Sequence, residues 1–291
     1  MVRRAPVAIV AIVAIVAMSL ALVVSAVPAG AASRSSVVAS FYPIAWAAQQ
    51  VGGNRVAVTN LTPAGAEPHD LELNPDQIDE VLDAKVVFDL GRGFQPAVEQ
   101  AAEQRDGPTV QLLPRGTKDP HVWLDPVRMA AIVRTVQREL TTADPKGRAV
   151  YARNADRVLG ELDAVNARFR DGLAHCERHV IVTAHEAFGH LARRYGLRQE
   201  GVAGLSPDAE PDAQRIGQLT DLVKRLGVTT VFTEELLSPR IATTLAREAG
   251  VRTETLNPLE GLTDAELHRG DDYVSVMDTN LTKLQAALGC S

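Results

Sequence analysis

Two histidines and a glutamate lie within six positions of one another in the segment TAHEAFGH, residues 183–190. A zinc protease helix carries two histidines four residues apart on one face, with a glutamate beside the metal as the general base. Here His185 and His190 are five residues apart, so a regular helix would rotate the second side chain by roughly 140° from the first. The spacing therefore argues against a protease helix.

The histidines instead follow predicted strands. The segment VIVT, residues 180–183, is β-branched and apolar, and a helical pattern follows it over residues 186–197. His185 thus lies between a strand and a helix, and open α/β sheets bind ligands beyond the carboxyl ends of their strands. His69 follows VAVTNLTP and His121 follows TVQLLP, so both also lie beyond strand ends.

A fourth donor is expected after the last strand, where VRTETLNPLEG offers Glu260 or, less well, Asn257. Three imidazoles and one carboxylate suit Zn²⁺, whereas Mn²⁺ tolerates more carboxylate and water. A single histidine near Pro or Asp is more often a hydrogen-bonded loop residue, and it is the agreement of three positions that indicates a site. The other histidines are interpreted as having no metal role: His175, His179, His190 and His268.

Several neighbours of these residues could support a metal site. A metal-bound imidazole needs an acceptor on its other nitrogen, but we do not expect Glu186 or His190 to serve. Glu234 and Glu235 end another predicted strand and could face the cleft, but the preferred interpretation is a solvated turn that caps a helix. Trp123 is expected to pack beside the site.

The elements that position these residues alternate between strand and helix patterns, which predicts α/β architecture with mostly parallel sheets. Between two such halves, a segment without a Gly–Pro break has Leu159, Leu162, Val165 and Phe169 at helical spacing. We therefore predict two (βα) lobes joined by one long helix, with the metal site in the cleft between them. The predicted boundaries are 33–146 for the N-terminal lobe, 147–175 for the helix and 176–291 for the C-terminal lobe.

The N-terminus predicts export. Arg3 and Arg4 precede a long apolar run, and small residues before Ser33 suit a signal-peptidase site, so residues 1–32 are predicted to be a signal peptide. The run is long enough that an uncleaved membrane anchor is the alternative. No Cys lies near the cleavage region, which argues against a lipid anchor there. The remaining 28 basic and 36 acidic residues argue against nucleic acid as a partner.

The chain has two cysteines, Cys176 and Cys290. In an exported protein they would meet an oxidising environment, which permits one disulfide that fastens the C-terminal tail. The alternative is two buried free thiols, because sequence alone does not give the geometry.

With these residues in view, the chain resembles the cluster A-I solute-binding proteins of ABC importers for zinc and manganese. The resemblance covers residues 37–288, nearly the whole mature chain. The segments that carry it are FYPIAWAAQQVGG, GAEPHDLELNPDQI, DPHVWLDP, TAHEAFGHLARRYGL, VAGLSPDAEPDAQRI, VFTEELLSPRIATTLAREAGV, LNPLEGLT and YVSVMDTNL. It implies two (βα) lobes joined by a rigid long helix, with one divalent metal between them.

The resemblance also implies a ligand set. The ligands of the family correspond to His69, His121 and His185. Many members carry Asp where this chain has Asn257, but a zinc-specific branch uses the Glu of its LNPLE motif, here Glu260, which we prefer. Manganese members tend to place a carboxylate at the position of His185, so zinc is favoured. The His-rich loop that many zinc members carry before DPHVWLDP is missing.

The function implied is a periplasmic or secreted protein that binds one Zn²⁺ per chain and delivers it to a membrane permease, without catalytic turnover. Four protein ligands leave no open position for an activated water. We expect a monomer, with the permease and a metallochaperone as candidate partners. The alternatives are a manganese or iron carrier of the same fold, a zinc hydrolase with Glu186 as base, and an adhesin in which metal is a structural staple.

Overall fold

The computed structural model describes residues 1–2, 34–207 and 211–291. The chain divides into two units, Met1–Ala32 and Ser33–Ser291, and the fold below is that of the second unit. The predicted signal peptide lies, apart from its first two residues, outside the described part of the chain. Among the described residues, no helix is both long enough and apolar enough to cross a membrane.

The N-terminal lobe is built on a four-stranded parallel sheet with the strand order β2-β1-β3-β4. Its central strand β1 is buried from Val37 to Ala39, as expected of a parallel sheet covered on both faces. The strands are β1 Ser35–Ala39, β2 Val56–Asn60, β3 Val86–Asp89 and β4 Thr109–Gln111. The helices are α1 Tyr42–Gly52, α2 Pro75–Asp83, α3 Pro96–Ala102 and α4 Pro126–Ala143.

The C-terminal lobe repeats this topology, with the order β6-β5-β7-β8 and all strands parallel. In both sheets the first strand is flanked by the second on one side and the third on the other, so each sheet has a switch point at its carboxyl edge. The strands are β5 Val180–Thr183, β6 Arg198–Gly201, β7 Thr230–Thr233 and β8 Arg252–Thr255. The helices are α6 Gly189–Arg194, α7 Ala213–Arg225, α8 Arg240–Ala249, α9 Asp264–Arg269 and α10 Tyr273–Leu288.

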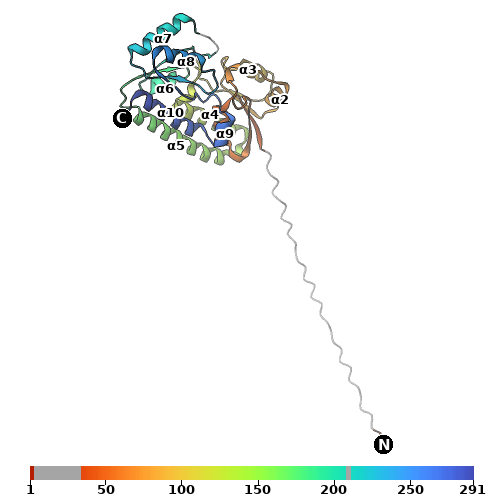
Figure 1. Ribbon diagram of the computed structural model, residues 1–291. Helices are drawn as coiled ribbons and strands as arrows, with labels where there is room; N and C mark the ends of the chain where they lie inside the picture. Colours follow the sequence, from red (N-terminus) through yellow and green to blue (C-terminus); the bar gives the residue numbers. More distant parts are fainter. Residues whose placement is uncertain (3–33, 208–210) are drawn as a thin grey trace. The chain divides into compact units, whose positions relative to one another are not determined.

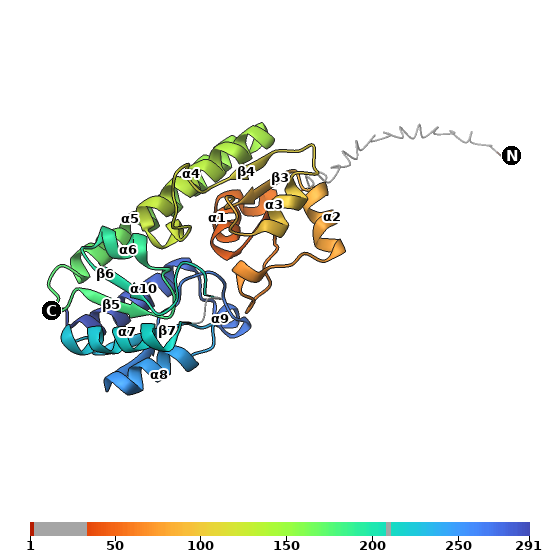
Figure 2. The same cartoon turned by 90° about the horizontal axis from the view of Figure 1, so that it is seen from above.

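One long helix, α5 Arg148–Gly172, connects the lobes and extends along both of them (Figures 1 and 2). It packs on α1 and α4 of the N-terminal lobe and on α10 of the C-terminal lobe. Its buried stripe recurs every three or four residues: Tyr151, Ala155, Val158, Leu162, Val165 and Phe169. One hydrophobic core runs from the first lobe through this stripe into the second, which confirms the predicted fold of two lobes and one long helix. The residue numbers proposed for the boundaries remain a prediction.

The helix predicted from Glu186 is shorter than expected and begins only at Gly189. The backbone N–H of His185 donates to Glu234 Oε1 at 3.0 Å, and that of Glu186 donates to the Gly204 carbonyl at 2.8 Å. These bonds hold residues 185–188 in an irregular turn. The consequence is that His185 stays beside the carboxyl edge of the sheet.

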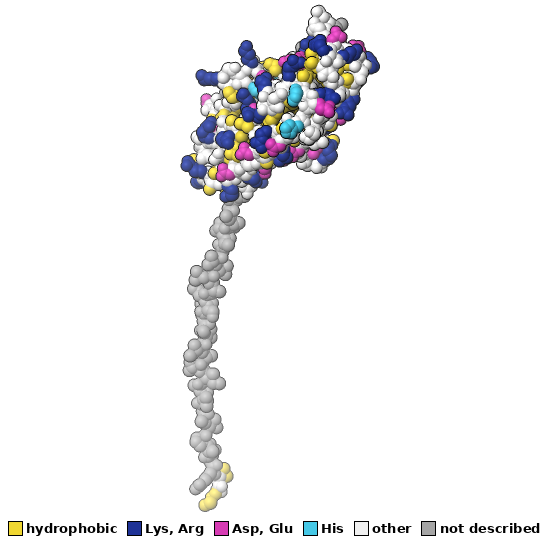
Figure 3. Space-filling view, turned by 90° about the vertical axis from the view of Figure 1, so that its left-hand side faces the viewer, with side chains coloured by type: hydrophobic (Ala, Val, Ile, Leu, Met, Phe, Trp, Pro, Cys, Tyr) yellow, Lys and Arg dark blue, Asp and Glu magenta, His cyan; other side chains and the backbone are white. Residues whose placement is uncertain are grey.

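Cys176 and Cys290 form a disulfide, so of the two alternatives for the cysteines the bridge is correct. It joins the segment after α5 to the end of the chain after α10. On the face shown in Figure 3, basic and acidic side chains are interspersed over the surface.

Candidate metal centre

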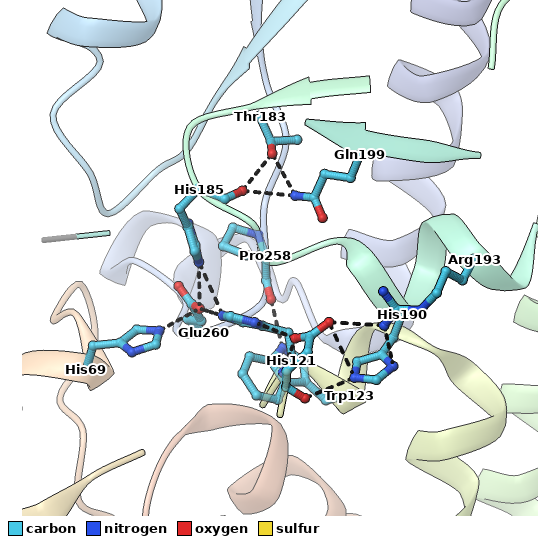
Figure 4. Close-up of polar contacts among 11 residues, drawn as sticks. His69, His121, Trp123, Thr183, His185, His190, Arg193, Gln199, Pro258 and Glu260 are labelled. Carbon is cyan, nitrogen blue, oxygen red and sulfur yellow. Dashed lines mark hydrogen bonds and ion pairs between the residues drawn. The ribbon is translucent and has the colours of Figure 1, made fainter. Parts of the chain in front are cut away.

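Four predicted residues from four separate loops meet in one place. His69 follows β2, His121 follows β4, His185 follows β5 and Glu260 follows β8. One potential ligand atom from each lies within 4.8 Å of the other three. Figure 4 shows the three imidazoles pointing at the carboxylate of Glu260. Two of these residues come from each lobe, so the group includes side chains of both lobes.

Four distances in this group match those of a tetrahedral site. Glu260 Oε1 lies 3.3 Å from His69 Nε2, 3.2 Å from His121 Nε2 and 3.3 Å from His185 Nε2. The two Nε2 atoms of His121 and His185 are also 3.3 Å apart. Metal–ligand bonds of about 2.0–2.1 Å in a tetrahedron require ligand atoms about 3.3–3.4 Å from each other. Four contacts in this group therefore have the spacing of four-coordinate zinc.

Burial and charge reinforce the arrangement. At most 1% of the surface of each of three of these residues is exposed: His121, His185 and Glu260. Burial alone would raise the pKa of Glu260, but its contacts with the imidazoles hold that pKa well below its usual range. Burial alone would lower the pKa of His185, but Glu234 and Glu260 raise it to about 10. A cation is therefore stabilised at this position, whether it is a proton or a metal ion.

A carboxylate outside the ligand group faces the far nitrogen of His185. Glu234 Oε2 lies 2.7 Å from His185 Nδ1. The interpretation of Glu234 as a solvated turn residue is wrong, since only 5% of it is exposed, whereas its neighbour Glu235 is exposed. Neither residue caps α8, whose N-cap is Pro239. A proton on Nδ1 leaves the Nε2 lone pair free for a metal.

Asp119 has the same relation to His121. Its Oδ1 lies 3.0 Å from His121 Nδ1 and also accepts the backbone N–H of His121 at 3.1 Å. Burial alone would raise the pKa of Asp119, but the hydrogen bond and charge of His121 lower it. With both Nδ1 atoms facing carboxylates, the Nε2 lone pairs of His121 and His185 face each other. Such a pair is favourable only when a proton or a metal ion lies between them.

The loop before α9 presents Glu260. The side chain of Asn257 accepts the backbone N–H of Leu259 at 2.7 Å and donates to Glu266 Oε1 at 2.9 Å. The side chain of Asn280 accepts from the backbone N–H of Asn257 and donates to the backbone carbonyl of Asn257. Leu259 has a φ of 57°, an unfavourable conformation for a branched side chain. Of the two alternative donors, Asn257 thus shapes the loop, while Glu260 contacts the imidazoles.

His69 lies on the more accessible side of the group, with 10% of its side chain exposed. A cavity of about 220 Å³ borders it, lined by residues of both lobes that include Arg92, Lys118 and Leu205. Trp123 is buried on the other side, as expected, and its indole N–H donates to the Pro258 carbonyl at 2.8 Å. His69 is therefore the member of the group that borders this cavity.

Comparison with known proteins decides the family. The profile of the family "Zinc-uptake complex component A periplasmic", ZnuA, matches residues 37–287. The chain belongs to this family. Membership of the ZnuA family confirms the resemblance to metal-binding solute-binding proteins. The description of the family is that of a zinc-uptake component. The prediction of a transport component, as opposed to an enzyme, is therefore confirmed for the family.

Individual members agree. The chain is 34% identical over 275 residues to the zinc-binding lipoprotein AdcA of Streptococcus pneumoniae TIGR4, covering 86% of this chain and 55% of AdcA. It is 32% identical over 277 residues to the high-affinity zinc uptake system protein ZnuA of Bacillus subtilis 168, covering 87% of each. This chain thus spans about half the length of the AdcA relatives.

A solved structure gives the same fold. The Zn(II)-bound ZnuA-like domain of Streptococcus pneumoniae AdcA superimposes with a TM-score of 0.77 at 34% identity, covering 88% of this chain and 99% of that domain. This match confirms the predicted two-lobe α/β architecture of the ZnuA family. Among the predicted alternatives, the hydrolase needed Glu186 at the metal, and Glu186 is not in the group of four.

Proposed function

We propose that this protein is the extracytoplasmic zinc-binding component of an ABC importer. It binds one Zn²⁺ per chain through His69, His121, His185 and Glu260, and it delivers the ion to a membrane permease. The observation that carries the proposal is the spacing of 3.2–3.3 Å between Glu260 Oε1 and the three imidazole nitrogens. The names of its relatives, which are zinc-binding proteins, support the same ion.

The donor set favours zinc over manganese. Three nitrogens and one oxygen, with four of their spacings at 3.2–3.3 Å, suit a four-coordinate borderline ion, whereas Mn²⁺ prefers more oxygen ligands and water. A manganese or iron carrier of the same fold is the alternative. It would hold its own ion against zinc in competition.

We infer that residues 1–32 act as a signal peptide and direct export. The family is described as periplasmic, which supports a location outside the cytoplasm. N-terminal sequencing of the exported protein would distinguish cleavage near Ser33 from an uncleaved anchor. A monomeric state and a metallochaperone partner remain predictions, and light scattering of the purified protein tests the first.

Two experiments test the function. Zinc titration against a chromophoric chelator should give one ion per chain, with affinity lost in His121→Ala and His185→Ala. Deletion of the gene should impair growth under zinc limitation, and only the wild-type chain should restore it. The manganese carrier would be favoured by the opposite result. In that case the deletion strain would grow normally under zinc limitation and poorly under manganese limitation.

A further inference from the structure

We propose that Asp119 is a positioning residue that ties the ligand His121, in the N-terminal lobe, to α6 of the C-terminal lobe. The inference rests on the proposed zinc function and adds how one ligand is held. Its basis is that the two oxygens of a single carboxylate face different lobes. The orientation of His121 thereby depends on a contact between the lobes.

The Oδ1 atom serves the N-terminal lobe. It accepts from both Nδ1 and the backbone N–H of His121, at 3.0 and 3.1 Å. The bond to the backbone N–H holds the carboxylate next to the residue, and the contact with Nδ1 favours the tautomer whose Nε2 faces Glu260. A partner of this kind on the far nitrogen of a ligand histidine usually matters for metal affinity.

The Oδ2 atom serves the C-terminal lobe. Arg193 donates to it at 3.2 Å, and His190 Nε2 lies 3.4 Å away. The same His190 nitrogen lies 3.0 Å from the backbone carbonyl of Asp119, and His190 Nδ1 accepts from Arg193 at 3.1 Å. His190 therefore acts as a neutral bridge, with its proton on Nε2. In Figure 4, His190 and Arg193 lie on the side of His121 away from Glu260.

Neighbouring contacts restrain the same segment. Arg194, next to Arg193 in α6, forms an ion pair with Asp125, the N-cap of α4. Tyr273 of α10 donates its hydroxyl to the Trp123 carbonyl at 2.6 Å. Residues 119–125 are thus held by the C-terminal lobe at several points, and Asp119 is the point that touches a ligand. His190 is outside the group of four, and its contacts are with Asp119 and Arg193.

The test is a double-mutant cycle on zinc affinity, with Asp119→Ala, Arg193→Gln and the double variant in the full chain. Removing a carboxylate of this kind should weaken zinc binding by about 10- to 100-fold. Arg193 touches no ligand, and Arg193→Gln should weaken zinc binding by about threefold or more. The double variant should bind zinc no more weakly than Asp119→Ala alone, because both substitutions remove the same connection between His121 and α6. Arg198→Gln is the matched control, since Arg198 is also exposed in the C-terminal lobe but pairs with Glu200.

A second readout separates positioning from general stability. The visible absorption of bound Co²⁺ should change in Asp119→Ala and in Arg193→Gln, and it should match the wild type in Arg198→Gln. Wild-type affinity in Asp119→Ala, wild-type affinity in Arg193→Gln, or fully additive losses in the double variant would each overturn the proposal. Failure of the wild-type chain to bind zinc would instead overturn the proposed function.

Discussion

Glu234 Oε2 lies 2.7 Å from Nδ1 of His185, and both residues are buried at the carboxyl edge of the C-terminal sheet. Glu234 follows β7, which pairs with β5 in the sheet. The strand pairing therefore sets the carboxylate beside the imidazole. The two atoms are at ion-pair distance without the alignment of a hydrogen bond, and a carboxylate at this position favours a proton on Nδ1, which leaves Nε2 for the other side of the ring.

Substitution of Glu234 should weaken zinc binding. In Glu234→Gln the charge opposite Nδ1 is lost, and we expect affinity to fall by about tenfold or more. The measurement is competition with a chelator of known affinity. Glu235→Gln is the control, because Glu235 is exposed and adjacent in sequence. Equal affinities in the two variants would contradict a role for the buried carboxylate.

Zinc affinity should depend on pH well above 6. The pKa of His185 in the metal-free protein is raised to about 10 and that of His121 is also raised, so zinc must displace protons at neutral pH. From the sequence alone, a steep loss is expected only below about pH 6, where free imidazole is protonated. The structure extends that loss, so the apparent affinity should increase continuously from pH 6 to pH 9. A flat profile would argue against the three-histidine site.

The stability of the metal-free protein should change in the opposite sense. His185 has a folded-state pKa of about 10, above its ordinary value of about 6.5. Its contribution is therefore fully present below pH 6.5 and is lost as the pH rises through 10. Thermal unfolding of the metal-free chain should show a falling Tm over this range, while the increase in Tm caused by zinc should grow. His185→Gln should remove this part of the pH dependence.

The two candidate fourth donors should behave differently. Glu260→Ala removes the oxygen at the centre of the group and should cause the larger loss of zinc affinity. Asn257→Ala removes the acceptor for the Leu259 N–H and should cost about 1–3 kcal/mol of unfolding free energy, with a smaller loss of affinity. Chemical denaturation and zinc titration of both variants check this. A larger affinity loss in Asn257→Ala would reverse the assignment.

The disulfide should stabilise the fold without shaping the site. Cys176 and Cys290 close a loop with a sequence separation of 114 residues, and loss of such a bridge typically costs about 2–5 kcal/mol. The Cys176→Ser, Cys290→Ser double variant should therefore unfold at a lower temperature with nearly unchanged zinc affinity. A reductant should lower the Tm of the wild type and leave that of the double variant unaffected.

That these histidines meet in the structure could be predicted from the sequence, because their positions follow local signals. Each of His69, His121 and His185 comes shortly after an apolar, β-branched segment, and parallel strands bring their carboxyl ends to one edge of a sheet. The long helix was also predictable, from the regular recurrence of apolar residues in α5. Local sequence patterns were sufficient for these features.

The supporting carboxylates could not be predicted in the same way. Which strand pairs with β5, and hence that Glu234 meets His185, depends on the strand order. The sequence does place Glu234 at the carboxyl end of a predicted strand, as it does the three histidines. The same position also fits a solvated turn. The contacts of Asp119 with α6 depend on how the two lobes meet, and the short α6 reflects tertiary hydrogen bonds that override helical periodicity.

Competitive metal loading tests the central claim most directly. The purified protein would be stripped with a chelator, reloaded with zinc, manganese and iron together, and analysed for bound elements beside Glu260→Ala. The account predicts one zinc per wild-type chain and a marked loss of zinc in Glu260→Ala. Retention of manganese or iron in place of zinc, or no bound metal at all, would contradict it.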